Sequence, residues 1–264
     1  MKGSILTLMI ISLLISPNLL MADRLVVAIE DADTAPYLWR DRNGDIEGFL
    51  PALYSKLIAQ TGHEVDFVFL SEDVFEDWPG VIADLDQGKY QLFGPTLIPE
   101  SVKNQVSIGE EPFVVVRMGV YYVPDRAFEV TSLESLFGKR GIGFGGGRAD
   151  NEESSIVLPG LNLVYGQRGE DFYNLLNSGK ADYWFNPKYI SNAYILSRGL
   201  RDKLVAADFQ LDIPLYLAGG SDERSKAILA QLDALIVEYR NSGQYQRLMS
   251  YYQNEYIKYY RGLK

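Results

Sequence analysis

The 264-residue sequence contains no cysteine and only one histidine, His63. The lack of cysteine excludes thiol catalysis, disulfide bonds, thiolate metal ligands and a lipid anchor on cysteine. A single histidine without thiolates does not supply the usual set of zinc ligands, so we expect no metal site.

Motifs for phosphate loops and for a nucleophilic serine are also missing. One glycine-rich segment, residues 141–146, matches the Gly-x-Gly-x-x-Gly pattern of dinucleotide-binding proteins. Its first two glycines, Gly141 and Gly143, fall within an expected strand instead of following it, so we reject a dinucleotide site. We therefore expect no cofactor.

Positive charge is scarce in this chain. The sequence has 25 Lys and Arg against 35 Asp and Glu, which gives a formal net charge of −10 and an isoelectric point near 4.7. A nucleic-acid partner is excluded because binding phosphates requires basic surfaces. A small ligand is not excluded, since the local charge in a cleft can oppose the net charge.

Residues 1–22 have the order of a secretory signal peptide, and no later segment is long and apolar enough to span a bilayer. Lys2 gives a positive start, Ile5–Ile15 form an apolar core, and Ala22 is a small residue suited to cleavage. An uncleaved membrane anchor is the alternative, but the apolar run is shorter than the roughly 20 residues of a spanning helix. We expect export and cleavage after Ala22.

Strands and helices are predicted to alternate along the rest of the chain. Leu25–Ile29 is an apolar run typical of a buried strand, Phe49–Gln60 has helical spacing of apolar residues, and Val65–Phe69 is a second strand. A similar alternation begins again after Val123. This order predicts an α/β fold with mainly parallel sheets.

The stretch from Trp78 to Phe113 contains the most informative motifs. Asp77 and Pro79 are typical of a helix start and Gly88 of a helix end, and a strand over Tyr90–Phe93 follows. The segment Gly94-Pro95-Thr96 comes next, and Glu111-Pro112-Phe113 leads into the long apolar run Val114–Val123.

This order resembles lobe one of bacterial extracellular solute-binding proteins of family 3, the periplasmic amino-acid-binding type. In that family a strand runs into Gly-x-Thr-x-Thr-x-x-Arg, and a Pro-Tyr pair then leads into the second lobe. The C-terminal segment SGQYQRLMSYY also resembles the family's last helix, so the resemblance covers residues 25–255. It implies the type II periplasmic binding protein fold, in which each of two lobes has a central, mainly parallel sheet flanked by helices. We expect lobe one over 23–115 and 215–264, and lobe two over 116–214.

The resemblance also implies a ligand site on lobe one. The loop Glu30–Trp39 would line the cleft, with Glu30 itself and the aromatic residues Tyr37 and Trp39 as ligand contacts. Trp78 would stack on the ligand, although a tryptophan that bridges helix and loop is the alternative. Thr96 matches the first threonine of the motif and would bind a ligand oxygen.

Two charged positions of the family pattern are replaced in this chain. Ser101 stands where the arginine that pairs with an α-carboxylate would be, and a serine cannot form that bidentate pair. Asn186 and Pro187 stand near the position of the aspartate that receives the ligand ammonium. Asn186 can still donate and accept hydrogen bonds, or it can cap the helix that follows.

Lobe two offers a glycine-rich turn as a further contact. At a strand-to-helix turn, backbone N–H groups can approach an anion. The residues concerned are Gly146, Gly147 and Arg148. Arg148 would supply the guanidinium that Ser101 lacks, or else serve a solvent or lobe–lobe role.

The leading hypothesis is a non-catalytic, monomeric periplasmic protein that captures a small polar ligand between two lobes. Its expected partner is an inner-membrane ABC permease or a sensor protein. The second hypothesis is an enzyme on the same fold, resembling cyclohexadienyl dehydratase, with Glu30 or Glu110 as the general acid. The third is a sensory or structural relative that has lost its ligand.

Overall fold

The computed structural model describes residues 24–143, 160–165 and 172–262. The expected signal peptide and the helix expected over residues 149–158 lie outside these ranges. In the part of the chain that is described, no helix is both long and apolar enough to cross a membrane.

The first part of the chain alternates strands and helices as the sequence predicts. Its elements are β1 (Arg24–Glu30), β2 (Trp39–Arg40), β3 (Ile46–Glu47), α1 (Phe49–Gln60), β4 (Glu64–Leu70), α2 (Glu72–Phe75), α3 (Trp78–Asp86), β5 (Leu92–Thr96), the 3-10 turn η1 (Glu100–Val102) and β6 (Ser107–Ile108).

The second part contains a similar set of elements and then two long helices. They are β7 (Val114–Tyr122), η2 (Pro124–Arg126), η3 (Leu133–Leu136), β8 (Arg140–Gly143), β9 (Asn162–Tyr165), α4 (Phe172–Asn177), β10 (Tyr183–Pro187), α5 (Lys188–Arg198), β11 (Val205–Gly219), α6 (Glu223–Asn241) and α7 (Gln244–Gly262).

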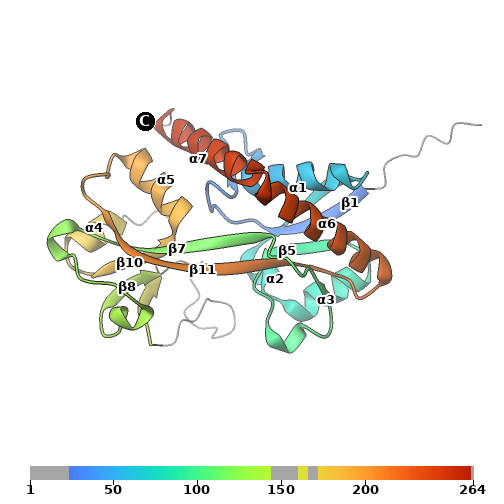
Figure 1. Ribbon diagram of the computed structural model, residues 1–264, viewed down its shortest axis with the longest axis horizontal. Coiled ribbons are helices and arrows are strands. Elements are labelled where there is room, and N and C mark those ends of the chain that lie inside the picture. The colour runs from blue at the N-terminus through green and yellow to red at the C-terminus, as the bar shows by residue number, and fades with distance from the viewer. Residues whose placement is uncertain (1–23, 144–159, 166–171, 263–264) are drawn as a thin grey trace, which may run out of the picture.

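The strands are arranged in two groups that two long strands connect. The spatial order is β4-β1-β5-β11-β7-β10-β8-β9, with β6 paired to β11. Pairs within the groups β4-β1-β5 and β10-β8-β9 are parallel, whereas β7 and β11 pair antiparallel with each other and with their neighbours. Figure 1 shows β7 and β11 crossing the middle of the molecule between the two groups. The two-lobed α/β fold predicted from the sequence is confirmed.

Each group of strands buries a different set of apolar side chains on each of its two faces. Along β1, Leu25 and Val27 belong to one core cluster and Ala28 to another. Along β10, Tyr183 and Trp184 likewise lie in separate clusters. Alternate residues of a strand point to opposite faces, so each group has an apolar core on both of its sides. Trp184 is only 1% exposed and is thus a core residue of the second group.

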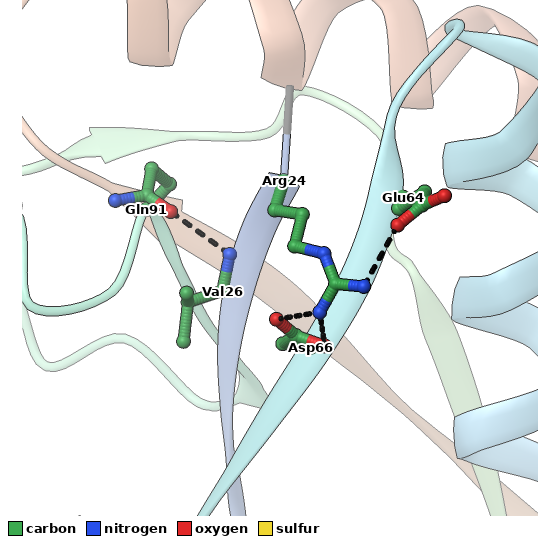
Figure 2. A network of polar contacts seen from close by, with 5 residues as sticks. All are labelled: Arg24, Val26, Glu64, Asp66 and Gln91. Carbon is green, nitrogen blue, oxygen red and sulfur yellow. Dashed lines mark hydrogen bonds and ion pairs between the residues drawn. The ribbon is translucent and has the colours of Figure 1, made fainter. Parts of the chain in front are cut away.

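Polar contacts fix the start of β1 between its two neighbouring strands (Figure 2). The Arg24 guanidinium lies 2.9 Å from a carboxylate oxygen of Asp66 and 3.0 Å from one of Glu64, both on β4. On the other side, the backbone N–H of Val26 donates to the side-chain oxygen of Gln91 at 2.8 Å. The ion pairs are exposed, so they contribute little to stability. They do agree with the register in which Arg24 is opposite Glu64.

Helix α6 anchors the segment that leads into β7. The backbone N–H groups of Glu110 and Glu111 both donate to the carboxylate of Asp233, at 2.8 and 3.2 Å. Burial raises the pKa of this carboxyl group, while the two backbone hydrogen bonds act in the opposite direction. Arg240 of the same helix donates to the carbonyl of Pro112. Helix α6 therefore fixes the position at which β7, the first crossing strand, begins.

We predict that Asp233→Ala lowers the free energy of unfolding by about 1–3 kcal/mol, because two backbone donors lose their acceptor. Denaturant unfolding measures this. Glu238→Ala, at an exposed position of the same helix, is the matched control and should change stability by less than about 0.5 kcal/mol. Equal stability of the two variants would contradict the anchoring role.

Candidate functional site

A cavity of about 120 Å³ lies where the two groups of strands and the crossing strands meet. The first group contributes residues from β1, the following loop, α1 and β5. The crossing strands β7 and β11 form part of the wall, and residues at the start of α5 complete it. The lining residues are Ile29, Glu30, Ala32, Thr34, Tyr37, Leu38, Leu50, Gly94, Pro95, Val114, Val116, Pro187, Ile190 and Leu215.

The loop after β1 is held against the start of α1. Backbone N–H groups of Phe49 and Leu50 donate to the carbonyls of Pro36 and Tyr37 at 3.0 and 2.9 Å. Gly48 has a φ of 142°, and a side chain there would collide with the backbone of Tyr37. Glycine is therefore required for the close approach that positions Tyr37 and Leu50 in the cavity wall.

The end of β5 is fixed by a second glycine. Gly94 has a φ of 115°, and an added Cβ would lie 2.9 Å from the carbonyl oxygen of Tyr216 on β11. The buried hydroxyl of Tyr54 donates to the carbonyl of Gly94 at 2.8 Å. The chain therefore passes close to β11 at this point, and Pro95 follows directly in the cavity wall.

The wall is mainly aliphatic and carries few polar groups. Among the described residues that line it, Glu30 is the only charged one, and the other polar side chains are those of Thr34 and Tyr37. Burial raises the pKa of the Tyr37 hydroxyl well above its usual value, and the nearby hydroxyls of Tyr245 and Tyr189 raise it further. Tyr37 is therefore neutral and can only donate or accept hydrogen bonds at physiological pH.

Of the residues predicted to bind ligand, the structure brings Glu30 and Tyr37 together in the cavity wall. Thr96 is next in sequence to the lining residue Pro95, and its hydroxyl lies 3.4 Å from the carbonyl of Leu97. Asn186 precedes the lining residue Pro187 and is only 4% exposed. Its amide donates to the hydroxyl of Ser191 in α5 at 2.9 Å.

The two predicted tryptophans lie outside the cavity lining. Trp39 packs edge-on against Tyr252 and Tyr256 of α7, with ring centroids 6.1 and 5.4 Å apart. Trp78, the first residue of α3, is partly buried and packs edge-on against Phe93 at 5.3 Å. Trp78 therefore packs on strand β5, and Trp39 packs on helix α7. Their contact with a ligand stays a prediction.

The glycine-rich turn lies outside the described residues, so the roles of Gly146, Gly147 and Arg148 also stay predictions. Ser101, which replaces the motif arginine, is exposed in η1. Its carbonyl accepts a hydrogen bond from Gln105 at 3.1 Å. Within the described ranges, no cluster of His, Asp or Glu has the arrangement of a metal site.

Sequence reasoning missed the aliphatic part of the wall. Val116, Ile190 and Leu215 line the cavity, but in the sequence each belongs to a strand or helix pattern that is typical of a core residue. Aliphatic residues in a strand or helix have the same pattern whether they face the core or a cavity. The sequence therefore holds no signal that separates these three residues from core residues.

Comparison with solved structures finds the same fold in amino-acid-binding proteins. An amino-acid ABC transporter substrate-binding protein from Streptococcus pneumoniae bound to L-arginine superposes with a TM-score of 0.60 at 20% identity, over 89% of this chain and 96% of that one. An ancestral arginine-binding protein bound to arginine gives 0.58 at 20% identity, over 88% and 99%. An ancestral amino-acid-binding protein described as a precursor of cyclohexadienyl dehydratase gives 0.58 at 22%, over 87% and 95%.

No family model matches the sequence, and no curated protein sequence matches it. The similarity is thus one of fold, at about 20% identity and over nearly the full length of each neighbour. The fold is that of the two-lobed periplasmic binding proteins, as the sequence resemblance predicted.

We predict that Trp78→Ala lowers the free energy of unfolding by about 2–4 kcal/mol, because the indole packs against Phe93 in a core cluster. Denaturant unfolding of the ligand-free protein measures this. Tyr251→Ala removes an aromatic ring that is 55% exposed, and should change stability by about 0.5 kcal/mol or less. A similarly small change for Trp78→Ala would favour the ligand-stacking role instead.

Proposed function

We propose that this protein is a divergent member of the family 3 solute-binding proteins. In this proposal residues 1–22 direct export to the periplasm, where the mature chain acts as a monomer. Lobe one, residues 23–115 and 215–264, and lobe two, residues 116–214, close over a small ligand. An inner-membrane ABC permease or a sensor protein then recognises the closed form.

The observation that carries the proposal is the cavity at the junction of the two lobes. Ligand sites are usually concave, mostly apolar and equipped with a few convergent polar groups. Here Glu30 and Thr34 supply polar groups from lobe one, and Ile190 supplies an apolar contact from lobe two. In open α/β sheets ligands bind beyond the carboxyl ends of the strands, which is where Glu30 lies on β1.

Glu30 and Tyr37 are the proposed ligand contacts with the strongest support, because both line the cavity. Thr96 and Asn186 are proposed as contacts at its edges, since each adjoins a lining residue. The mainly aliphatic wall supports a ligand with an apolar body as well as the polar group expected from the sequence.

An enzyme on the same fold is the second candidate function, and the position of Glu30 favours it. A carboxylic acid in an apolar cavity is the environment in which general acids occur. Glu110, the other candidate acid, is exposed and lies outside the cavity lining. Turnover of a prephenate-like acid that Glu30→Gln abolishes would establish this alternative.

We predict that Leu50→Trp, which places an indole in the cavity, abolishes the thermal shift caused by any small molecule that stabilises the parent protein. A metabolite panel tested by thermal unfolding identifies such molecules. Lys56→Trp, on an exposed position of the same helix, is the control and should keep the shift. Retention of the shift in Leu50→Trp would place the ligand elsewhere.

We predict that standard α-amino acids bind weakly. Neither exposed Ser101 nor buried Asn186 can pair with a charged ligand group, and loss of a charge partner costs on the order of 2–5 kcal/mol. That range turns micromolar binding into roughly tens of micromolar to millimolar binding. Calorimetry with arginine and glutamine measures the constants. A micromolar dissociation constant for either would contradict the inference.

A further inference from the structure

We propose that Tyr189 is the positioning residue that sets the lobe-two wall of the cavity by docking the start of α5 on lobe one. This deepens the proposed function and rests on it, because it assigns a role in forming the same cavity. The observations that support this proposal concern the contact between α5, in the expected lobe two, and α7, in the expected lobe one.

Tyr189 is attached to α7 by two hydrogen bonds. The side-chain amide of Gln246 donates to its hydroxyl at 2.5 Å, and that of Gln253 donates to its backbone carbonyl at 3.4 Å. These two glutamines lie seven positions apart on α7, which is two helical turns, so they share one face of the helix. One residue of α5 is therefore held at both its ring and its backbone by the same helix face.

The ring of Tyr189 also contacts the opposite wall of the cavity. It packs edge-on against Tyr37, with ring centroids 6.4 Å apart and an angle of 85° between the planes. Such aromatic pairs contribute beyond the area that they bury. Tyr189 and its neighbour Ile190 both pack against the core cluster of lobe one, although they belong to the segment expected in lobe two.

The residues around Tyr189 line the cavity itself. Pro187 lies two positions before it and Ile190 directly after it, and both form part of the wall. Fixing Tyr189 therefore fixes the only two described lobe-two residues outside the crossing strands that line the cavity. A change in the docking of α5 would move both of them relative to Tyr37.

Contacts at the other end of α5 show that the docking extends along the whole helix. Arg261 of α7 donates to the carbonyl of Leu196 at 3.0 Å. The guanidinium of Arg198 lies 4.6 Å from the ring centroid of Tyr260 on α7. Figure 1 shows the C-terminal part of α7 extending toward α5. These contacts orient α5, while Tyr189 connects that orientation to the lining residues on either side of it.

The test measures the distance between the lobes in the protein as purified. Because the chain has no cysteine, Lys56→Cys on lobe one and Asp202→Cys on lobe two accept exactly one spin label each. Electron–electron resonance gives the distribution of label distances. In this background Tyr189→Phe removes the hydroxyl, Tyr189→Ala also removes the ring, and Gln246→Ala removes the donor from an exposed position.

We expect the distance distribution to widen or shift in the order Tyr189→Ala, then Tyr189→Phe and Gln246→Ala. Tyr251→Ala, at an exposed position of α7, is the control and should leave the distribution unchanged. An unchanged distribution in folded Tyr189→Ala, or an equal change in the control, would overturn the proposal. If Tyr189→Ala does not fold, an unchanged distribution in both milder variants overturns it.

The readout needs no ligand, so it is independent of the test of the proposed function. A widened distribution in a protein that binds no metabolite would support the positioning role of Tyr189 and reject the solute-binding function. Binding of a metabolite together with an unaltered distribution in Tyr189→Ala would support the solute-binding function and reject the positioning role of Tyr189.

Discussion

The antiparallel pairing of β7 with β11 is the constraint on which the rest of the structure depends. The two strands pair from Val114 opposite Leu215 to Val205 opposite Tyr122, with one irregularity, and they connect both groups of parallel strands. An exposed bidentate ion pair between Arg117 and Asp212 lies along this pairing at 2.7 and 2.8 Å. The hydrogen bonds from Arg117 lower the pKa of Asp212, so the pair is charged at neutral pH.

The cavity depends on this pairing because both strands contribute to its wall. Their lining residues Val114, Val116 and Leu215 are aliphatic, and the polar groups come from Glu30 at the end of β1 and from the loop that follows. Among the described lining residues only Glu30 is charged, so this part of the wall holds no cationic partner for a carboxylate. The family resemblance implies an arginine for that purpose.

The sequence predicted the fold well because its signals are local and regular. The helix over Phe49–Gln60 was predicted with its observed bounds. Prediction was poorer where pairing with strands distant in sequence determines where a strand begins and ends. Pro214 lies inside the 15-residue strand β11, opposite Val115, and its place there depends on pairing with β7. The strand expected at Tyr90–Phe93 instead spans Leu92–Thr96, because its pairing with β1 and β11 sets its ends.

The site was predictable only in part, for a physical reason. The resemblance to the family, and no pattern in the residues themselves, pointed to the loop with Glu30 and Tyr37. The aliphatic wall and the docking of Tyr189 depend on residues distant in sequence coming together. A single sequence carries no periodic signal for such contacts.

The most direct test of the account is native mass spectrometry of the protein purified from the periplasm without denaturation. We predict a mass that exceeds the mature polypeptide by that of one small molecule, and that returns to the polypeptide mass on denaturation. Leu50→Trp, with its cavity filled, should show the polypeptide mass alone under both conditions. The same excess mass in parent and Leu50→Trp protein would contradict binding in the cavity. A bare polypeptide mass, together with no stabilisation by any metabolite tested, would contradict the solute-binding function.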